Sequence, residues 1–137
     1  MSRSSRKISD TPDGSNEQKF EEIIRFLFTD LSTSETTNFF PALWALAIHD
    51  ESVARKMHSI YKTERDYLAE SIASLRPDLS RKDIDLLAVF ASASIEGHTL
   101  YIGHRYDRQS STMEIANMAV RCIIDLVRRF EPEQAPL

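Results

Sequence analysis

The sequence predicts an all-α fold, a five-helix bundle, on three observations. Apolar residues recur at steps of three and four along most of the chain, which places them on one face of a helix. Only 3 glycines and 5 prolines occur among 137 residues, and most lie at breaks between the apolar segments. Such a scarcity of turn residues disfavours a β fold. The length fits one domain that can bury a core.

Residues 1–16 are expected to form a disordered leader, because Ser, Asp, Thr, Pro and Gly leave almost nothing to bury. They lack the apolar core of a signal peptide. Arg3, Arg6 and Lys7 are the only local basic excess, and the net charge of the chain is −4. This balance argues against a self-sufficient nucleic-acid-binding protein.

The first two helices are expected over residues 17–31 and 35–48. Ser15 and Gln18 form a capping pattern before the first of them. The second is apolar nearly all round and should therefore be largely buried. Pro41 either occupies the first turn of this helix or kinks it.

The third helix is expected over residues 51–76. Asp50 is a suitable N-cap, and Pro77 prevents the helix from continuing. Its apolar stripe contains one carboxylate, Glu64. Charged residues of both signs lie mainly off the stripe, which indicates a solvated face.

The last two helices are expected to begin after Ser80 and Ser111 and to run to about residues 102 and 130. Each starts with a capping pattern, completed by Asp83 and Glu114, and Gly103 suits the exit of the fourth helix. Residues 17–131 thus make up the domain, and residues 132–137 are expected to be a frayed tail.

The fourth and fifth helices carry apolar residues around more of their girth than a helix covering a small bundle needs. A second copy of the chain is the simplest partner, because homodimers are the commonest oligomers. Which face of each helix forms the interface stays open, as does a monomer in which the third helix covers them. The expected interface residues are Leu86, Val89, Ala93, Leu100, Ile115, Ala119, Cys122, Ile123 and Leu126.

No catalytic residue, cofactor or metal site is expected. The four histidines, His49, His58, His98 and His104, lack the spacing of a metal site and are interpreted as separate core or surface residues. Cys122 lies in an apolar run and is interpreted as buried packing. Phosphate loops, nucleophile elbows and Cys-x-x-Cys pairs do not occur in the sequence. An enzyme therefore has no positive support, and a small helical-bundle enzyme remains the weakest alternative.

A ligand pocket between helices is suggested by aromatic and polar residues on the second, third and fourth helices. Each aromatic residue fits either the core or a pocket wall. Glu96 and His98 fit either an ordinary hydrogen-bonded role or a ligand contact. The candidate ligand-binding residues are Phe39, Phe40, Leu43, Trp44, Tyr61, Tyr67, Phe90, Ser94, His98 and Tyr101.

The order of these elements resembles the C-terminal domain of TetR-type transcriptional regulators. Phe40-Pro41-Ala42-Leu43-Trp44-Ala45-Leu46-Ala47-Ile48-His49-Asp50-Glu51 resembles the aromatic helix, acidic break and next helix start of that family. Ile60-Tyr61-Lys62 on a long helix and the Ile95-Glu96-Gly97-His98 step resemble the elements that follow. The resemblance covers about residues 17–130.

Cys122 is the single cysteine, so no internal disulfide is possible and a cytoplasmic location is expected. The resemblance implies a dimer in which the last two helices of each subunit form an intersubunit four-helix bundle. It also implies a pocket for a small hydrophobic or aromatic effector. In the family, effector binding changes the separation of two N-terminal helix-turn-helix heads and releases DNA. No recognition helix is present in these 137 residues, so this chain alone is not expected to read DNA. The alternative is an interaction module that forms a heterodimer with a full-length regulator. No 18-residue apolar run occurs, so no membrane partner is expected.

Overall fold

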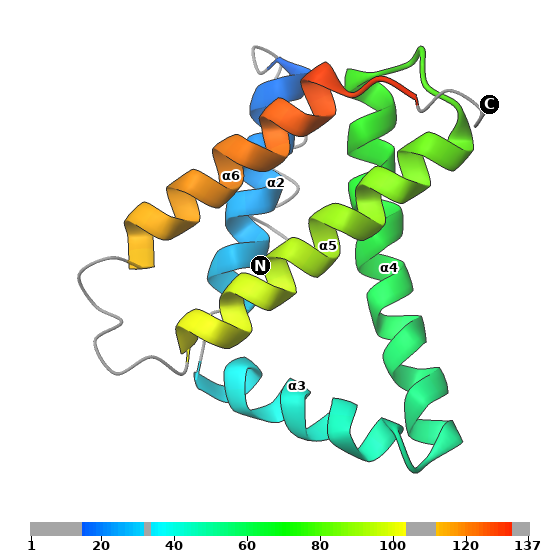
Figure 1. Ribbon diagram of the computed structural model, residues 1–137, viewed down its shortest axis with the longest axis vertical. Coiled ribbons are helices and arrows are strands. Elements are labelled where there is room, and N and C mark those ends of the chain that lie inside the picture. The colour runs from blue at the N-terminus through cyan, green and yellow to red at the C-terminus, as the bar shows by residue number, and fades with distance from the viewer. Residues whose placement is uncertain (1–14, 32–33, 104–111, 133–137) are drawn as a thin grey trace, which may run out of the picture.

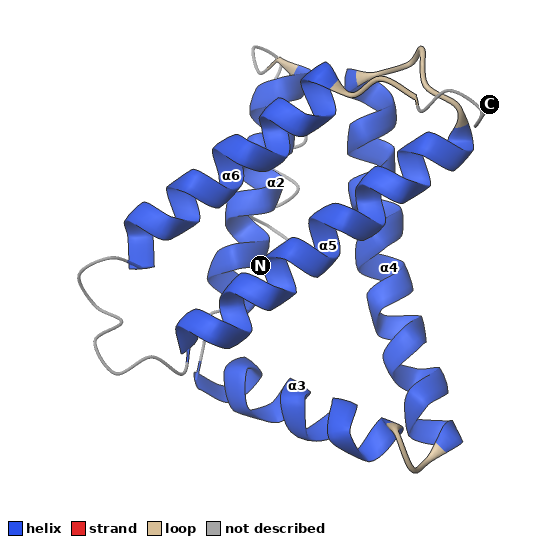
Figure 2. Ribbon diagram, viewed as in Figure 1, coloured by secondary structure: helices blue, strands red, loops and turns tan. Residues whose placement is uncertain are grey.

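The computed structural model describes residues 15–31, 34–103 and 112–132, and within these ranges all regular structure is helical (Figures 1 and 2). The leader expected over residues 1–16 and the tail expected over 132–137 lie outside the described residues, apart from residues 15, 16 and 132. The helices are α2 (Asn16–Leu31), α3 (Ser34–Ala47), α4 (Glu51–Leu75), α5 (Arg81–Gly103) and α6 (Thr112–Arg129). The predicted all-α fold is confirmed.

The predicted caps explain where three of these helices begin. Ser15 Oγ accepts a hydrogen bond from the backbone N–H of Gln18 at 3.0 Å, and Ser80 Oγ accepts one from Asp83 at 3.2 Å. The carboxylate of Asp50 accepts from the backbone N–H groups of the second and third residues of α4 at 3.0 and 3.3 Å. Each cap satisfies backbone donors that have no partner inside the helix. The expected cap at Ser111 lies outside the described residues.

Helix α2 begins one residue earlier than predicted. The side-chain amide of Asn16 donates to the backbone oxygen of Ser74 at 3.1 Å, which ties the first turn of α2 to the end of α4. Glu17 in the same turn pairs with Arg128 of α6, whose Nε lies 2.9 Å from Glu17 Oε1. These contacts between distant parts of the chain could not be read from the local pattern.

Four helices share one apolar core. Figure 1 shows α6 crossing α2 and α5 crossing α4, while α3 lies at one end of the bundle, where it contacts α4, α5 and α2. The core residues are Phe20, Ile23, Ile24 and Phe28 of α2, Leu68, Ala69 and Ile72 of α4, Leu79, Ile84, Leu87, Ala88, Ala91 and Ile95 of α5 and the turn before it, and Ala119, Val120, Ile123, Ile124 and Val127 of α6. None of the α3 side chains that the structure describes, residues 39–47, belongs to this core.

The prediction that the second helix is largely buried is wrong. On and just after α3, Phe39, Leu46 and Ile48 are 58%, 49% and 79% exposed. The helix packs on α4, α5 and α2, and these described helices leave part of its apolar surface uncovered. Pro41 lies inside α3 and lacks the N–H that would bond to the preceding turn.

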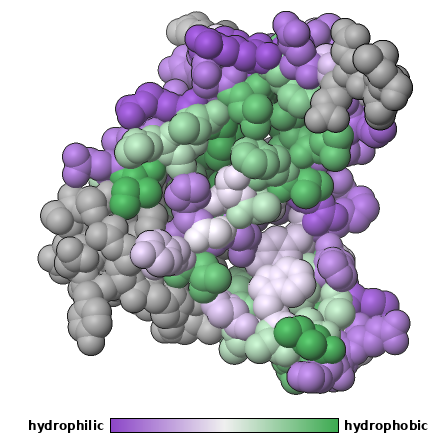
Figure 3. All heavy atoms as spheres, in the orientation of Figure 1, coloured by the Kyte–Doolittle hydropathy of each residue, from purple (hydrophilic) through white to green (hydrophobic). Residues whose placement is uncertain are grey.

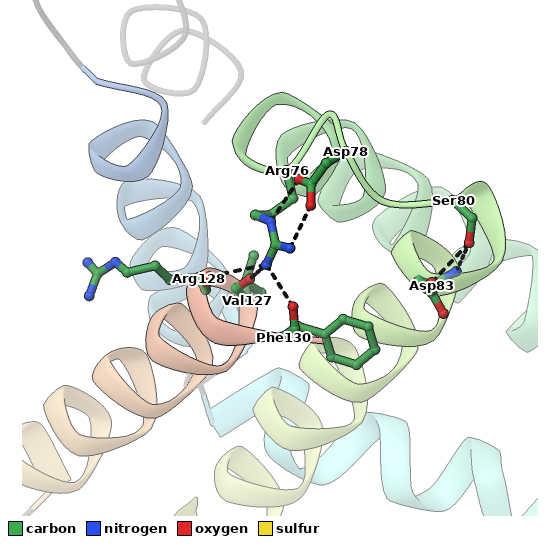
Figure 4. Close-up of polar contacts among 7 residues, drawn as sticks. All are labelled: Arg76, Asp78, Ser80, Asp83, Val127, Arg128 and Phe130. Atoms are coloured by element: carbon green, nitrogen blue, oxygen red, sulfur yellow. Dashed lines mark hydrogen bonds and ion pairs between the residues drawn. The ribbon is translucent and has the colours of Figure 1, made fainter. Parts of the chain in front are cut away.

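Arg76 joins the C-terminal ends of α4 and α6 (Figure 4). Its Nη1 donates to the backbone oxygens of Val127, Arg128 and Phe130 at 3.0, 3.1 and 3.0 Å. Its Nε and Nη2 donate to the carboxylate of Asp78 at 2.9 and 2.7 Å. The last carbonyls of a helix carry partial negative charge and have no partner within the helix, so the guanidinium satisfies them and complements the helix dipole.

Candidate functional site

The aromatic residues of α3 meet Tyr61 of α4 outside the main core. The rings of Trp44 and Tyr61 stack with their centroids 5.4 Å apart at an angle of 28°. Phe40 meets Tyr61 edge to face at 6.1 Å, and Phe39 meets Phe40 in the same way at 5.5 Å. His58 adds an edge contact to Trp44 at 5.9 Å. We call these five residues the aromatic cluster. Tyr61 is buried, whereas Trp44 is 39% exposed.

Glu96 of α5 ends a chain of hydrogen bonds that starts in this cluster. The indole N–H of Trp44 donates to Tyr61 Oη over 3.4 Å, and the Tyr61 hydroxyl donates to Glu96 Oε1 at 2.7 Å. The other carboxylate oxygen, Glu96 Oε2, is buried and has no hydrogen-bond partner among the described residues. Burial of an acceptor without a donor costs free energy, so this oxygen marks an incomplete polar site.

The surroundings of Glu96 disfavour its charged form. Burial raises the pKa of Glu96 above its usual value, the hydrogen bond from Tyr61 lowers it, and the charge of Glu64 raises it further. Burial also raises the pKa of Tyr61, with the hydrogen bond to Glu96 as the second cause, so Tyr61 keeps its proton and acts as a donor. Glu64 itself accepts a hydrogen bond from Ser92 Oγ at 2.6 Å.

His98 lies on the side of α5 that faces α2. Its ring meets buried Phe28 edge to face at 6.1 Å, and its Nδ1 lies 2.6 Å from the backbone oxygen of Ser94. His98 and Ser94 are both half-buried. Because a carbonyl oxygen can only accept, His98 Nδ1 is the donor in this contact with Ser94.

The candidate ligand-binding residues fall into three groups. The aromatic cluster brings together four of them, Phe39, Phe40, Trp44 and Tyr61. Leu43 is half-buried on α3. Ser94 and His98 lie on α5, two residues before and after Glu96. The others are exposed: Tyr67 by 36%, Phe90 by 54% and Tyr101 by 74%. Phe90 cannot face the aromatic cluster as Glu96 does. The two residues are six positions apart, which places them about 120° apart around the axis of α5.

Sequence reasoning left the role of Glu96 undecided and did not include Glu64, His58 or Ser92 among the candidate ligand-binding residues. The one sequence feature that could have pointed to this site is Glu64, a carboxylate within the apolar stripe of the third predicted helix. Its contact with Ser92 depends on how α4 crosses α5.

Some of the predicted interface residues are exposed in the structure and others are buried in the core. Leu86, Val89 and Leu100 of α5 are 55%, 50% and 46% exposed, and Ala93 lies on the same exposed face. Phe90 joins this face, which Figure 3 shows as part of an apolar area over α5 and α6. These residues are available to a partner.

Ala119 and Ile123, which were also predicted as interface residues, are only 6% and 3% exposed. They face the core and cannot supply a large contact area. The prediction that Cys122 is buried is also wrong, since Cys122 is exposed. Its apolar neighbours in sequence turn inward, whereas Cys122 shares the outer face of α6 with half-buried Ile115 and Leu126 and with Met118, which is 57% exposed.

A pocket of about 540 Å³ opens between α2 and α6. Several of its charged groups pair with one another: Arg128 contacts both Glu17 and Asp125. None of the candidate ligand-binding residues lines this pocket. The lining residues are Glu17, Glu21, Met118, Arg121, Cys122, Ile124, Asp125 and Arg128.

The part of the chain that the structure describes contains no group of three or more His, Cys, Asp or Glu residues placed to hold a metal ion. His49 and His58 are exposed, and His104 lies outside the described residues. Within the described ranges, no helix is both long and apolar enough to cross a bilayer.

One comparison with known proteins gives a match. A model of the TetR-type C-terminal domain, described as that of BetI-type transcriptional repressors, matches residues 16–120. The match runs from the start of α2 into the first half of α6 and includes Trp44, Tyr61 and Glu96. No curated protein and no solved structure matches the chain.

Proposed function

Because the chain belongs to the family of BetI-type transcriptional repressor C-terminal domains, we propose that it binds a small effector between α3, α4 and α5 and dimerises through α5 and α6. The family is a transcription-regulator domain and not an enzyme family. DNA would be contacted by a helix-turn-helix domain that is not part of these residues.

The unpaired Glu96 Oε2 beside the Trp44–Tyr61 stack is the observation that carries the effector site. Ligand sites combine apolar and aromatic walls with a few placed polar groups, and this part of the molecule has both. It also lies outside the main core, so a change there can occur without loss of the buried apolar contacts that hold α2, α4, α5 and α6 together.

The proposed mechanism is a shift between two arrangements of the helices. The aromatic cluster links α3 to α4, and the Tyr61–Glu96 hydrogen bond links α4 to α5. A ligand that binds one arrangement better than the other shifts their populations. Since α5 also carries the exposed apolar face, such a shift would reach the dimer partner.

Native mass spectrometry of the purified chain, under gentle and then denaturing conditions, tests this proposal. We expect a dimer that carries a small non-covalent mass or takes one up from an apolar compound library, and Trp44→Leu should weaken this uptake. Ile48→Leu, which changes a residue that is 79% exposed, is the matched control. A dimer that binds no compound would instead favour the interaction module, and a monomer would contradict dimerisation through α5 and α6.

A further inference from the structure

The hydrogen-bond donors around Glu96 are already directed elsewhere. Tyr61 has one hydroxyl hydrogen, and it is donated to Oε1, while the single N–H of Trp44 is donated to Tyr61. Ser92 Oγ donates to Glu64, and His98 Nδ1 faces the backbone oxygen of Ser94. None of these groups serves Glu96 Oε2. A ligand that brings its own donor to this oxygen would remove the cost of an unpaired buried acceptor.

The charge at the site selects a cation. Glu64 on α4 and Glu96 on α5 interact electrostatically, and Glu96 forms no ion pair with any residue that the structure describes. A carboxylate that is shielded from water and lacks a cationic partner attracts a positive group and repels an anion. An acidic effector therefore fits this site poorly.

The aromatic cluster strengthens the same preference. The faces of aromatic rings attract cations, and Trp does so most strongly. Trp44 and Tyr61 lie directly on the hydrogen-bond path to Glu96, so one ligand can contact the rings and the carboxylate together. A neutral apolar molecule would satisfy the rings alone. A quaternary ammonium would satisfy the charge but carries no N–H for Oε2.

We infer that the effector is an organic cation with at least one N–H group, such as a protonated amine or an amidinium, whose N–H binds Glu96 Oε2 while its apolar part contacts the aromatic cluster. This inference rests on the proposed effector-binding function. Because Oε2 is buried, the ligand reaches it only when a covering side chain moves. Phe39, Trp44 and His58 are the exposed members of the cluster.

The test uses the fluorescence of Trp44, which is the only tryptophan of the chain and lies in the site. Four probes share one phenyl group and differ in their head: 2-phenylethylammonium, its N-trimethyl analogue, 2-phenylethanol and 3-phenylpropanoate. We expect the ammonium probe to bind at least about tenfold more tightly than each of the other three, as a hydrogen bond to a charged group implies. This comparison uses the unmodified chain and so does not depend on the folding of a variant.

Two variants locate the effect. Glu96→Gln should remove the advantage of the ammonium probe, whereas Glu70→Gln, on an exposed position of α4, should leave it unchanged. Equal binding of the alcohol, the carboxylate or the trimethyl probe would overturn the inference and leave the effector function standing. An advantage that survives in Glu96→Gln would overturn it too. If neither these probes nor any member of the apolar compound library binds, both this inference and the proposed effector-binding function fail.

Discussion

At the scale of the residue, Glu96 is the least satisfied group in the described part of the molecule. It accepts a hydrogen bond on one oxygen and has none on the other, and it lies between an aromatic stack and a second carboxylate. A site of this kind lowers the stability of the free protein, and a ligand that supplies the missing hydrogen bond stabilises the folded state. Glu96 therefore links the stability of the chain to its proposed function.

Glu96 should make the stability depend on pH. Because its pKa is raised in the folded chain, mainly by burial, the folded state holds this proton more tightly than the unfolded state does. Its contribution to stability is therefore present below the unfolded pKa and is lost as pH rises through the folded pKa. We expect Glu96→Gln to raise the urea midpoint relative to the parent at about pH 7, and to do so less at about pH 4.

Glu70→Gln is the matched control and should change the urea midpoint little at either pH. A loss of stability in Glu96→Gln of the same size at both pH values would contradict this account. That result would mean that the carboxylate is satisfied in the folded chain.

Gly97 offers a second prediction at this scale. It lies inside α5 on the exposed side, and a Cβ added there would meet no atom within 4 Å. Gly97→Ala should therefore stabilise the single chain by about 0.5–1 kcal/mol, because alanine favours the helix. If a partner helix packs closely here, the added methyl group should also weaken the dimer, which sedimentation at several concentrations measures. A dimer of unchanged affinity would place the interface away from Gly97.

At the scale of the element, the ends of α4 and α6 depend on one side chain. Arg76 reaches three carbonyl oxygens at the end of α6, and its side chain is only 19% exposed. Sequence reasoning placed the end of the third helix here because of Pro77. It had no means of finding a contact between residues that are more than fifty positions apart.

Arg76→Ala should lower the free energy of unfolding by about 2 kcal/mol, since it leaves helix carbonyls and Asp78 without their charged donor. Urea unfolding measures this loss. Arg81→Ala is the matched control, because Arg81 pairs with Asp85 one turn along an exposed face, and such pairs contribute less than about 1 kcal/mol. Equal effects of the two variants would show that Arg76 contributes no more than a surface ion pair.

At the scale of the whole molecule, exposed apolar residues of the described chain occur on two pairs of helices. One surface is the outer face of α5 and α6, with Leu86, Val89 and Phe90 half exposed. The other involves α3 and the first half of α4, with Leu46 and Ile60 about half exposed. A face of this kind on α5 and α6 is what a symmetric dimer of helix pairs requires.

Leu86→Asp should dissociate the proposed dimer, because a twofold axis places the new charge twice in an apolar contact. We expect at least a hundredfold weaker association, on the order of several kcal/mol, measured by light scattering during size-exclusion chromatography. The matched control is Ile60→Asp, which adds the same charge at a residue that is 51% exposed on α4. If Ile60→Asp dissociates the dimer and Leu86→Asp does not, the interface lies on the other surface.

The sequence by itself determined the helices. Apolar steps of three and four, caps such as Asp50 and Ser80, and Pro77 are local signals, and the structure ends its helices within about two residues of the prediction. The same local information supported the family resemblance, which the family match confirms. It also marked Trp44 and Tyr61 as candidates, because their residue types are typical of ligand pockets.

Only the tertiary structure decided which apolar faces are covered. Cys122 and Ile123 are neighbours in one apolar run, yet Cys122 is exposed and Ile123 faces the core that α6 shares with α2, α4 and α5. The hydrogen bond from Tyr61 to Glu96 joins residues 35 positions apart. It forms because α4 and α5 pack together where these two residues lie. Burial and cross-helix contacts depend on how helices pack, and a periodic pattern defines a face without defining its neighbour.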